Sequence, residues 1–366
     1  MITVVTGASG FVGSALCRAA RAAGHQVLAL GRRRTVPADL IGGAPYLSWD
    51  LADPAARPAL PPPFTRPDAV IHCAGLATDW ARPEAFHRGN VLATRGALAA
   101  FPEAARFVHL STASVYDPRR PTVMAREDEA DTVRHTDAYG RSKTLAEQWV
   151  RRTRPDAVIL RPHAVYGPGD TTLLPRVLRA VRRTPYGPRL FAIGDGRQRL
   201  SLTSVANLVD ACLLAAQGEA RGTFNITDRD PVVLDDVLRQ VLAAHGLPTT
   251  PVYLPLALAL PLARTAELLT RTTRSTRDPR LTVYAARHLA HERTLDLTAA
   301  HTHLAYHPAP TDLAPALRRA SAPRRRAGHA APPPWVGPTS VQVWGAGSRE
   351  PAGGNSAARP GPKRPR

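Results

Sequence analysis

The first thirty residues combine two short apolar runs with one helical pattern. Residues 2–6 (ITVVT) form a β-branched apolar run, and residues 26–30 (QVLAL) form a second one after Gly24. Between them, residues 11–23 carry apolar side chains at helical spacing. Short β-branched runs bounded by turn residues are typical of buried strands. The segment therefore predicts a βαβ unit.

The same alternation of strand and helix patterns continues to about residue 162. The expected elements are strands at 69–75, 106–112 and 157–162, and helices at 84–100 and 138–152. Strands that alternate with helices favour a parallel, doubly wound sheet with helices on both faces. The sequence thus predicts an α/β fold with a Rossmann-type nucleotide-binding domain over 1–162, part of whose sheet later strands can complete.

The pattern after residue 162 is interrupted by Pro and Gly. It still contains helical stretches at 205–217 and 233–245, so we expect a smaller, mostly helical substrate-binding lobe over 163–320. Residues 321–366 are rich in Pro, Gly, Ser and Arg and show no periodicity. Such a composition cannot bury a core and predicts a disordered basic tail.

Composition limits the classes of function. The chain of 366 residues is 44% hydrophobic, which is enough for a nucleotide-binding domain with a second lobe. Its formal net charge is +19, of which the tail carries +7 through eight basic residues and one acidic residue. The other positive residues are scattered and are not interleaved with aromatic residues, so we expect no specific nucleic-acid partner.

Cysteine content and hydropathy indicate the compartment. Cys17, Cys73 and Cys212 are widely spaced, which predicts buried free thiols and neither a metal site nor a disulfide framework. No charged and apolar leader precedes the first strand, and we expect a cytoplasmic protein. The apolar stretch 254–263 contains two prolines and is too short to span a bilayer. A packed helix or loop is expected there rather than a membrane contact.

A glycine-rich turn, TGASGFVG at residues 6–13, joins the first strand to the first helix. Glycines at this spacing permit a tight turn and a close approach of the backbone to a pyrophosphate, which the helix N-terminus attracts. The alternative is a purely structural turn. The residues expected to contact a dinucleotide here are Gly7, Ser9, Gly10, Phe11, Val12 and Gly13.

The residues after the second strand bear on the choice of cofactor. NAD-binding domains usually place a carboxylate there for the ribose 2′-hydroxyl, but this chain has Gly31 followed by Arg32, Arg33 and Arg34. Guanidinium groups match a 2′-phosphate, so the sequence favours NADPH, with NADH as the alternative. Solvated arginines in an arginine-rich chain would explain the same pattern.

Tyr139 and Lys143 form a Y-x-x-x-K pattern on an expected helix, which places both side chains on one face. Only two of the 48 basic residues are lysines, so a lysine here calls for a chemical reason. An ammonium close to a phenol is expected to lower the phenol's pKa from about 10 and to make it a usable acid or base. Thr112 ends the strand at 106–112, where its hydroxyl can bind a substrate oxygen or be satisfied locally.

These motifs together resemble the extended short-chain dehydrogenases/reductases, the superfamily of the NAD-dependent epimerases and dehydratases. The resemblance covers about residues 1–320. The matching segments are TGASGFVG, Asp50-Leu51, HCAG at 72–75, Asn90-Val91, STASVY at 111–116, YGRSK at 139–143, RPHAVYGPGD at 161–170 and GDG at 194–196.

The resemblance implies roles for individual residues. Tyr139 would be the acid/base, Lys143 its electrostatic partner and Thr112 the ligand of the substrate oxygen. Homodimerisation through the helices at 84–100 and 138–152 is also implied. The cofactor contacts implied by position come from Asp50, Leu51, Ala74, Gly75, Asn90, Tyr139, Lys143, Pro162 and His163, of which the last is equally explained as an ordinary loop histidine.

Departures from the motifs of the superfamily indicate which of its branches the chain resembles. Nucleotide-sugar enzymes usually have Asn where this chain has Ala164, and Arg where it has Leu200. The segments RPHAVYGPGD, GTFNITDRDPV (222–232), DPRLT (278–282) and LAYHP (304–308) resemble the branch of 3β-hydroxysteroid dehydrogenases, sterol dehydrogenases and 3-keto acid reductases. One departure is Asp117, where the pattern usually has Gly.

The branch implies interconversion of a secondary alcohol and a ketone on a small, apolar molecule, by hydride transfer to or from the cofactor. One alternative is a nucleotide-sugar epimerase or dehydratase that uses the same three side chains. A second is a noncatalytic, cofactor-binding regulatory protein, against which the intact Thr112, Tyr139 and Lys143 argue.

Overall fold

A computed structural model describes residues 1–130, 137–185, 187–247, 249–273 and 278–320. These residues lie within one compact unit that runs from Met1 to Pro323. The tail at 321–366, for which we expect disorder, lies outside the described residues.

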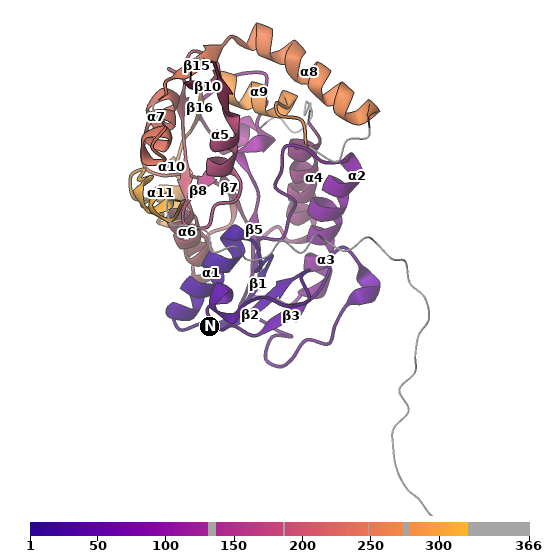
Figure 1. Cartoon of the computed structure of the whole chain (residues 1–366). Coiled ribbons are helices and arrows are strands. Elements are labelled where there is room, and N and C mark those ends of the chain that lie inside the picture. The colour runs from indigo at the N-terminus through magenta and orange to yellow at the C-terminus, as the bar shows by residue number, and fades with distance from the viewer. Residues whose placement is uncertain (131–136, 186, 248, 274–277, 321–366) are drawn as a thin grey trace, which may run out of the picture. The chain divides into compact units, whose positions relative to one another are not determined.

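A seven-stranded parallel sheet forms the centre of the fold (Figure 1). Its strand order, β13-β7-β5-β4-β1-β2-β3, contains the order 3-2-1-4-5 of a doubly wound nucleotide-binding sheet. The strands are β1 (Ile2–Thr6), β2 (Gln26–Gly31), β3 (Tyr46–Ser48), β4 (Ala69–His72), β5 (Arg106–Leu110), β7 (Val158–Pro162) and β13 (Gly222–Ile226). The predicted Rossmann-type fold is confirmed.

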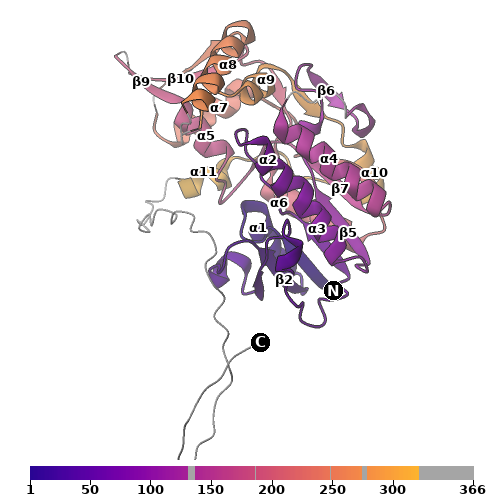
Figure 2. The same ribbon diagram turned by 90° about the vertical axis from the view of Figure 1, so that its right-hand side faces the viewer.

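Helices cover both faces of this sheet because the strands are apolar on both sides. Val5 packs in one core cluster with residues of α1 and α6, while its neighbour Val4 packs in a second cluster with residues of α3 and α4. Figure 2 shows α2, α3 and α4 side by side along the second face. The helices are α1 (Phe11–Ala22), α6 (Val205–Gln217) and α10 (Thr298–Leu304), and on the other face α2 (Pro83–Phe86), α3 (Ala93–Ala100) and α4 (Ala138–Thr153).

Two features of this domain were not predicted. The short strand β3 joins the edge of the sheet beyond β2. The helix expected at 84–100 is divided, since a π-helical turn at His87–Leu92 separates α2 from α3. Single π turns inside helices occur frequently at functional sites. Here the turn carries Asn90, which is buried.

The second lobe combines helices with three small sheets, most of whose strands are two to four residues long and leave no clear pattern. Its helices are α5 (Leu173–Ala180), α7 (Leu234–Ala244), α8 (Leu256–Thr272), α9 (Val283–Ala290) and α11 (Ala314–Ala320). Its sheets are formed by β9 (Val181–Thr184), β10 (Gly187–Ile193) and β15 (Pro251–Leu254), by β6 (Thr122–Ala125), β11 (Arg199–Leu200), β14 (Val232–Val233) and β16 (Arg293–Leu295), and by β8 (Val165–Tyr166) and β12 (Thr203–Ser204).

The apolar stretch 254–263 contributes most of its residues to helix α8, which packs on α9 and lies at the top of Figure 1. A packed helix or loop was expected there. Within the described part of the chain, no helix combines the length and apolarity needed to cross a membrane.

Candidate active site

The glycine-rich turn lies where β1 meets β4, and it leaves no space for a side chain at Gly7 or Gly13. A Cβ on Gly7 would lie 2.7 Å from the Ala74 nitrogen, and Gly7 has a φ of +67°. A Cβ on Gly13 would lie 2.3 Å from the Gly7 carbonyl oxygen. The Ala74 N–H also donates to the Thr6 hydroxyl at 3.1 Å, which holds the two strand ends together. The backbone is thus exposed at the carboxyl ends of two central strands.

The helix that follows suits an anion. Helix α1 begins after Gly10, has no side-chain hydrogen bond at its N-cap and has no acidic residue in its first turn. Its first N–H groups and its dipole therefore face the turn without a competing carboxylate. The exposed backbone and the uncapped helix end fit the diphosphate of a dinucleotide, as the sequence predicts.

The end of β2 presents arginines. Arg32 and Arg33 are exposed, and the Arg33 carbonyl oxygen accepts a hydrogen bond from the Tyr46 hydroxyl at 2.8 Å. Nearby, Asp50 accepts from Arg88 Nη2 at 2.8 Å. Burial raises the pKa of Asp50, but the hydrogen bond from Arg88 and the charges of Arg88 and Arg32 outweigh it and lower the pKa overall. Asp50 is therefore ionised and already paired.

Asn90 connects two parts of the site. Its Oδ1 accepts from the Leu76 N–H at 2.7 Å, and its Nδ2 donates to the Ser142 hydroxyl at 2.8 Å. A Cβ on Gly75 would lie 3.1 Å from Asn90 Oδ1. Asn90 thereby fixes the loop after β4, which contains Ala74 and Gly75, against helix α4.

Helix α4 carries the Tyr139 and Lys143 pair, as predicted. Asp137 caps the helix by accepting from the Gly140 N–H at 2.6 Å. The Lys143 ammonium is 5% exposed and donates to the Leu110 carbonyl oxygen at 2.6 Å. Burial lowers the pKa of Lys143 to about 8, although the charge of Glu147 opposes this. The lysine thus reaches the end of β5 beside Thr112.

The Thr112 hydroxyl lies close enough to the Tyr139 phenol to influence its pKa, so two of the predicted catalytic residues are close to each other. Burial raises the pKa of the Tyr139 phenol to about 12, whereas the Thr112 hydroxyl lowers it and Asp137 raises it. The expectation that Lys143 lowers this pKa is wrong for this structure, because burial dominates. Tyr139 is therefore a protonated phenol at neutral pH.

The segment after β7 is held by the second lobe. The His163 N–H donates to the Thr203 hydroxyl at 3.1 Å, and His163 Nδ1 lies 2.6 Å from the Ser201 carbonyl oxygen. This contact satisfies one ring nitrogen and agrees with a structural role for the ring. Pro162, the last residue of β7, lies beside it. Ala164 follows with a φ of +45°.

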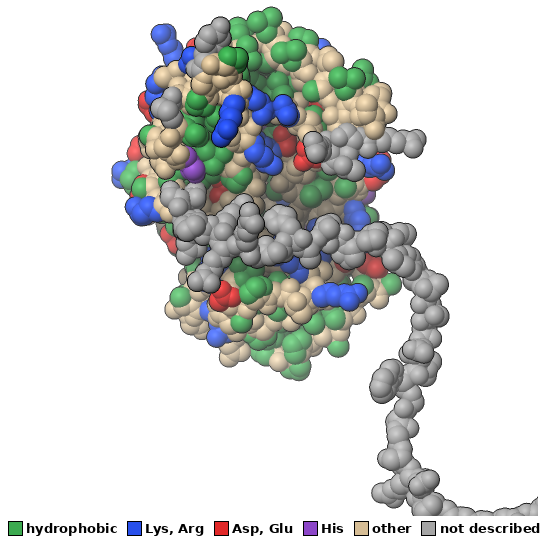
Figure 3. Space-filling model, viewed as in Figure 1, with side chains coloured by type: hydrophobic (Ala, Val, Ile, Leu, Met, Phe, Trp, Pro, Cys, Tyr) green, Lys and Arg blue, Asp and Glu red, His purple; other side chains and the backbone are tan. Residues whose placement is uncertain are grey.

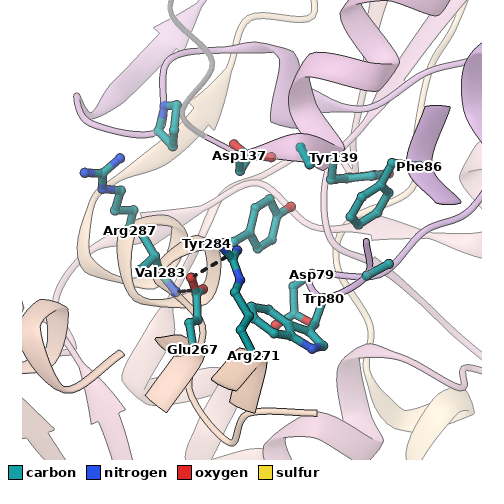
Figure 4. A pocket seen from close by; sticks show the side chains of 13 residues that line it. Asp79, Trp80, Phe86, Asp137, Tyr139, Glu267, Arg271, Val283, Tyr284 and Arg287 are labelled. Atoms are coloured by element: carbon teal, nitrogen blue, oxygen red, sulfur yellow. Dashed lines mark hydrogen bonds and ion pairs between the residues drawn. The ribbon is translucent and has the colours of Figure 1, made fainter. Parts of the chain in front are cut away.

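A cavity of about 140 Å³ lies against Tyr139 (Figure 4). Three further aromatic side chains line it: Trp80, Phe86 and Tyr284. The ring of Tyr139 is 5.9 Å from that of Phe86 and 6.0 Å from that of Tyr284, measured between centroids. The charged side chains at the cavity are Asp79, Asp137, Glu267, Arg271 and Arg287.

Sequence reasoning missed two hydroxyl residues of this site. Ser114 lies inside the STASVY motif, but only Thr112 was assigned a role there. Tyr284 follows the DPRLT segment, which was used only to indicate the branch. The Ser114 and Tyr284 oxygens are 2.7 Å apart, although 170 positions separate these residues in the chain. The spacing of apolar residues along the sequence carries no information on a contact between residues so far apart.

Comparison with known proteins assigns the family. The profile of the NAD dependent epimerase/dehydratase family matches residues 3–227, which is more than half of the chain. The chain belongs to this family. Family membership confirms the resemblance to extended short-chain dehydrogenases/reductases and agrees with a nicotinamide dinucleotide as the cofactor.

Individual relatives of this epimerase/dehydratase family member are reductases and dehydrogenases. The chain is 32% identical over 304 residues to the 2-alkyl-3-oxoalkanoate reductase of Stenotrophomonas maltophilia, covering 79% of this chain and 89% of the relative. It is 27% identical over 266 residues to the decarboxylating sterol-4-alpha-carboxylate 3-dehydrogenase of Homo sapiens, covering 69% and 68%. The prediction of an NAD(P)-dependent dehydrogenase/reductase acting on a small molecule is thereby confirmed.

Solved structures bear out the fold. The UDP-glucuronic acid 4-epimerase of Bacillus cereus, in complex with NAD, superposes with a TM-score of 0.65 at 21% identity. The match covers 87% of this chain and 97% of the epimerase. At this identity the likeness shows a shared fold.

Proposed function

We propose that this family member interconverts two forms of a small molecule: a 3-oxo acid with an apolar alkyl chain and the corresponding secondary alcohol. NADPH is the reductant. The observation that carries the proposal is the Tyr139 phenol at the wall of an aromatic cavity, with the Thr112 hydroxyl close enough to lower its pKa. A phenol and a hydroxyl this close to each other can both reach one substrate oxygen.

The chemistry follows from these groups. A bound reduced nicotinamide supplies the hydride. Tyr139 delivers its proton to the carbonyl oxygen as that oxygen gains charge, and Thr112 donates a hydrogen bond to the same oxygen. The Lys143 ammonium, held at the Leu110 carbonyl oxygen, stabilises the phenolate that Tyr139 becomes. Oxidation of the alcohol is the reverse sequence.

Two kinds of side chain support a 3-oxo acid as the substrate. The rings of Trp80 and Phe86 offer an apolar wall for an alkyl chain. Arg271 and Arg287 line the same cavity and are the basic residues that a carboxylate could approach there, although Arg271 also lies 3.9 Å from Glu267. The two relatives described above are named for substrates that carry a carboxylate.

The preference for NADPH is supported at the end of β2. Arg32 and Arg33 are exposed there, and the sequence between Gly31 and Pro37 contains no carboxylate. Asp50 lies close enough to Arg32 for the guanidinium to lower its pKa, but the Asp50 carboxylate is already paired with Arg88. Two exposed guanidinium groups at the end of β2 suit a 2′-phosphate.

We also infer a homodimer formed through α3 and α4, as the family resemblance implies. Arg95 of α3 and Arg152 of α4 stack on the ring of Trp149, at 4.4 and 4.6 Å from its centroid. Helices α3 and α4 thus contact each other around this ring. Sedimentation of the purified protein measures its mass, and a monomer at micromolar concentration would contradict the inference.

The experiment that tests the activity is a comparison of substrates. Purified protein is incubated with NADP⁺ and a 2-alkyl-3-hydroxyalkanoate whose alkyl groups are unbranched. Formation of the reduced nicotinamide is followed by absorbance. A parallel incubation with NAD⁺ and UDP-glucose is analysed for epimerised or dehydrated products. We expect turnover of the hydroxy acid only, whereas turnover of UDP-glucose alone would assign the nucleotide-sugar activity.

Binding of cofactor without turnover of any alcohol or ketone would instead assign a regulatory role.

Figure 3 shows Lys and Arg side chains at separate places on one face of the molecule, interspersed with hydrophobic side chains. This scattered distribution supports a small-molecule partner over nucleic acid.

A further inference from the structure

The second lobe contributes a hydroxyl to the active site. The Tyr284 phenol, on helix α9, lies 2.7 Å from the Ser114 hydroxyl. The Thr112 hydroxyl donates to the same Ser114 oxygen at 3.2 Å. Three hydroxyl groups therefore form one hydrogen-bonded chain from Thr112 through Ser114 to Tyr284, and its Thr112 end lies close to Tyr139.

The hydrogens in this chain are limited. Each hydroxyl has one hydrogen to donate. Thr112 also accepts from the Ser114 N–H at 3.2 Å, so its oxygen is already engaged as an acceptor. To bind a ketone oxygen, Thr112 must turn its hydrogen away from Ser114 and toward the substrate. Ser114 is only 3% exposed, and a buried acceptor that loses its donor is costly.

Tyr284 is placed to remove that cost. Thr282 caps helix α9 by accepting from the Ala285 N–H at 3.0 Å, and it donates to Asp79 Oδ2 at 2.9 Å. These two bonds fix the start of α9 to the loop after β4. The Tyr284 ring also packs on His288, with centroids 4.0 Å apart. We therefore expect the phenol to stay in place when Thr112 turns; Figure 4 shows Tyr284 among the residues that line the cavity.

We propose that Tyr284 is a positioning residue that donates to Ser114 and so keeps the Thr112 hydrogen available for the substrate oxygen. The inference rests on the proposed function, because it assigns Tyr284 a part in the same reaction. Burial raises the pKa of Tyr284 well above its usual range, so its hydrogen is present at every pH at which the enzyme is assayed. Tyr284 acts through Ser114 and Thr112 and transfers no proton to the substrate.

The test uses the full-length enzyme with NADP⁺ and a 2-alkyl-3-hydroxyalkanoate. Tyr284→Phe keeps the ring and removes the donor, and we expect kcat/KM to fall about tenfold, the equivalent of one hydrogen bond. The Kd for NADPH should not change. Tyr253→Phe is the matched control, because the Tyr253 hydroxyl donates to Asp235 and lies outside this chain of hydroxyls. We expect that control to keep wild-type kcat/KM.

A second variant separates positioning from packing. Ser114→Ala removes the acceptor that competes for the Thr112 hydrogen. The double variant Ser114→Ala, Tyr284→Phe should therefore recover kcat/KM to within about threefold of the wild type. A double variant as slow as Tyr284→Phe alone, or a Tyr284→Phe variant as fast as the wild type, would overturn the inference.

The outcome is distinguishable from failure of the proposed function. Thr112→Val and Tyr139→Phe are measured in the same assay, and both should abolish turnover if the proposed chemistry is right. If both do so while Tyr284→Phe has no effect, only the role of Tyr284 is wrong. If the wild-type enzyme oxidises neither this acid nor other secondary alcohols, the proposed function fails, and the role of Tyr284 fails with it.

Discussion

Glu147 and Arg161 form a buried, bidentate ion pair directly behind the active site. Arg161 Nη2 lies 2.8 Å from Glu147 Oε2, and Arg161 Nε lies 3.0 Å from Oε1. The two side chains are 1% and 2% exposed. Ser111 donates to Glu147 Oε1 at 2.6 Å, so the pair joins helix α4 to the ends of β5 and β7. It lies one helical turn beyond Lys143.

Replacing Glu147 by Gln should destabilise the fold by about 3 kcal/mol, since it leaves the Arg161 charge buried without a counter-ion. Thermal and urea unfolding measure the change. Glu103→Gln is the control, because Glu103 pairs with Arg66 at the surface, where the side chains are 59% and 78% exposed. A surface pair contributes about 0–1 kcal/mol. Equal stability of the two variants would contradict a structural role for the buried pair.

Acid should weaken the same pair. Burial raises the pKa of Glu147, but hydrogen bonds and charge from Arg161 outweigh it and hold the pKa below its ordinary value of 4.5. A carboxyl with a depressed folded-state pKa stabilises the fold fully above the unfolded-state value and loses that contribution as pH falls through the folded-state value. The stability difference between wild type and Glu147→Gln should therefore shrink below about pH 4.

The pH dependence of catalysis should report Lys143. Its pKa is lowered from 10.5 to about 8 by burial, while Glu147 raises it. Since the ammonium form stabilises the Tyr139 phenolate that forms during ketone reduction, kcat/KM for reduction of the ketone by NADPH should fall as pH rises through about 8. Glu147→Gln removes the charge that raises this pKa and should move the alkaline limb to lower pH. A limb that stays in place in this variant would show that another group controls it.

The arginines after β2 should decide the cofactor. Changing Arg32 and Arg33 together to Ala should weaken NADPH binding by at least about 10-fold, since the loss of even one charge-assisted hydrogen bond to a phosphate costs about 1.5–3 kcal/mol. NADH binding should change little. Fluorescence titration with each cofactor measures both values. An equal loss for NADPH and NADH would show that the arginines do not contact a 2′-phosphate.

The glycine-rich turn should tolerate no side chain at Gly13. A Cβ there would lie 2.3 Å from the Gly7 carbonyl oxygen, and backbone atoms cannot move aside. Gly13→Ala should therefore abolish measurable binding of both cofactors. Gly10→Ala is a graded comparison, because its Cβ would lie 3.2 Å from the same oxygen and needs only a small shift. Equal cofactor affinities of the two variants would show that crowding of the Gly13 Cβ against the Gly7 carbonyl oxygen does not determine binding.

The main elements of the fold could be predicted from the sequence because their signals are local. Val4 and Val5 lie in an apolar run, the glycines lie in one turn, and Tyr139 and Lys143 lie on one helix. Strand β3 could not be predicted, because three residues at a sheet edge leave no periodicity. The contact between Ser114 and Tyr284 depends on how α9 packs against the loop after β5, which no local pattern encodes.

The raised pKa of Tyr139 illustrates the same limit. The spacing of Tyr139 and Lys143 predicts an interaction that lowers the phenol's pKa, but it carries no information on burial. In the structure burial prevails, and the pKa rises to about 12. Desolvation depends on all the groups that surround a side chain, including those of the second lobe. Its effect on the Tyr139 pKa can therefore be judged only from the folded structure.

The most direct test of the account is turnover of a 2-alkyl-3-hydroxyalkanoate with NADP⁺ by the wild type and by Tyr139→Phe, followed through the reduced nicotinamide. Fluorescence titration of both proteins with NADPH confirms that the site is intact. We predict at least a ~10³-fold loss of kcat with an unchanged Kd for NADPH, as expected for removal of the acid/base. A Tyr139→Phe variant that turns over as fast as the wild type would contradict the central claim.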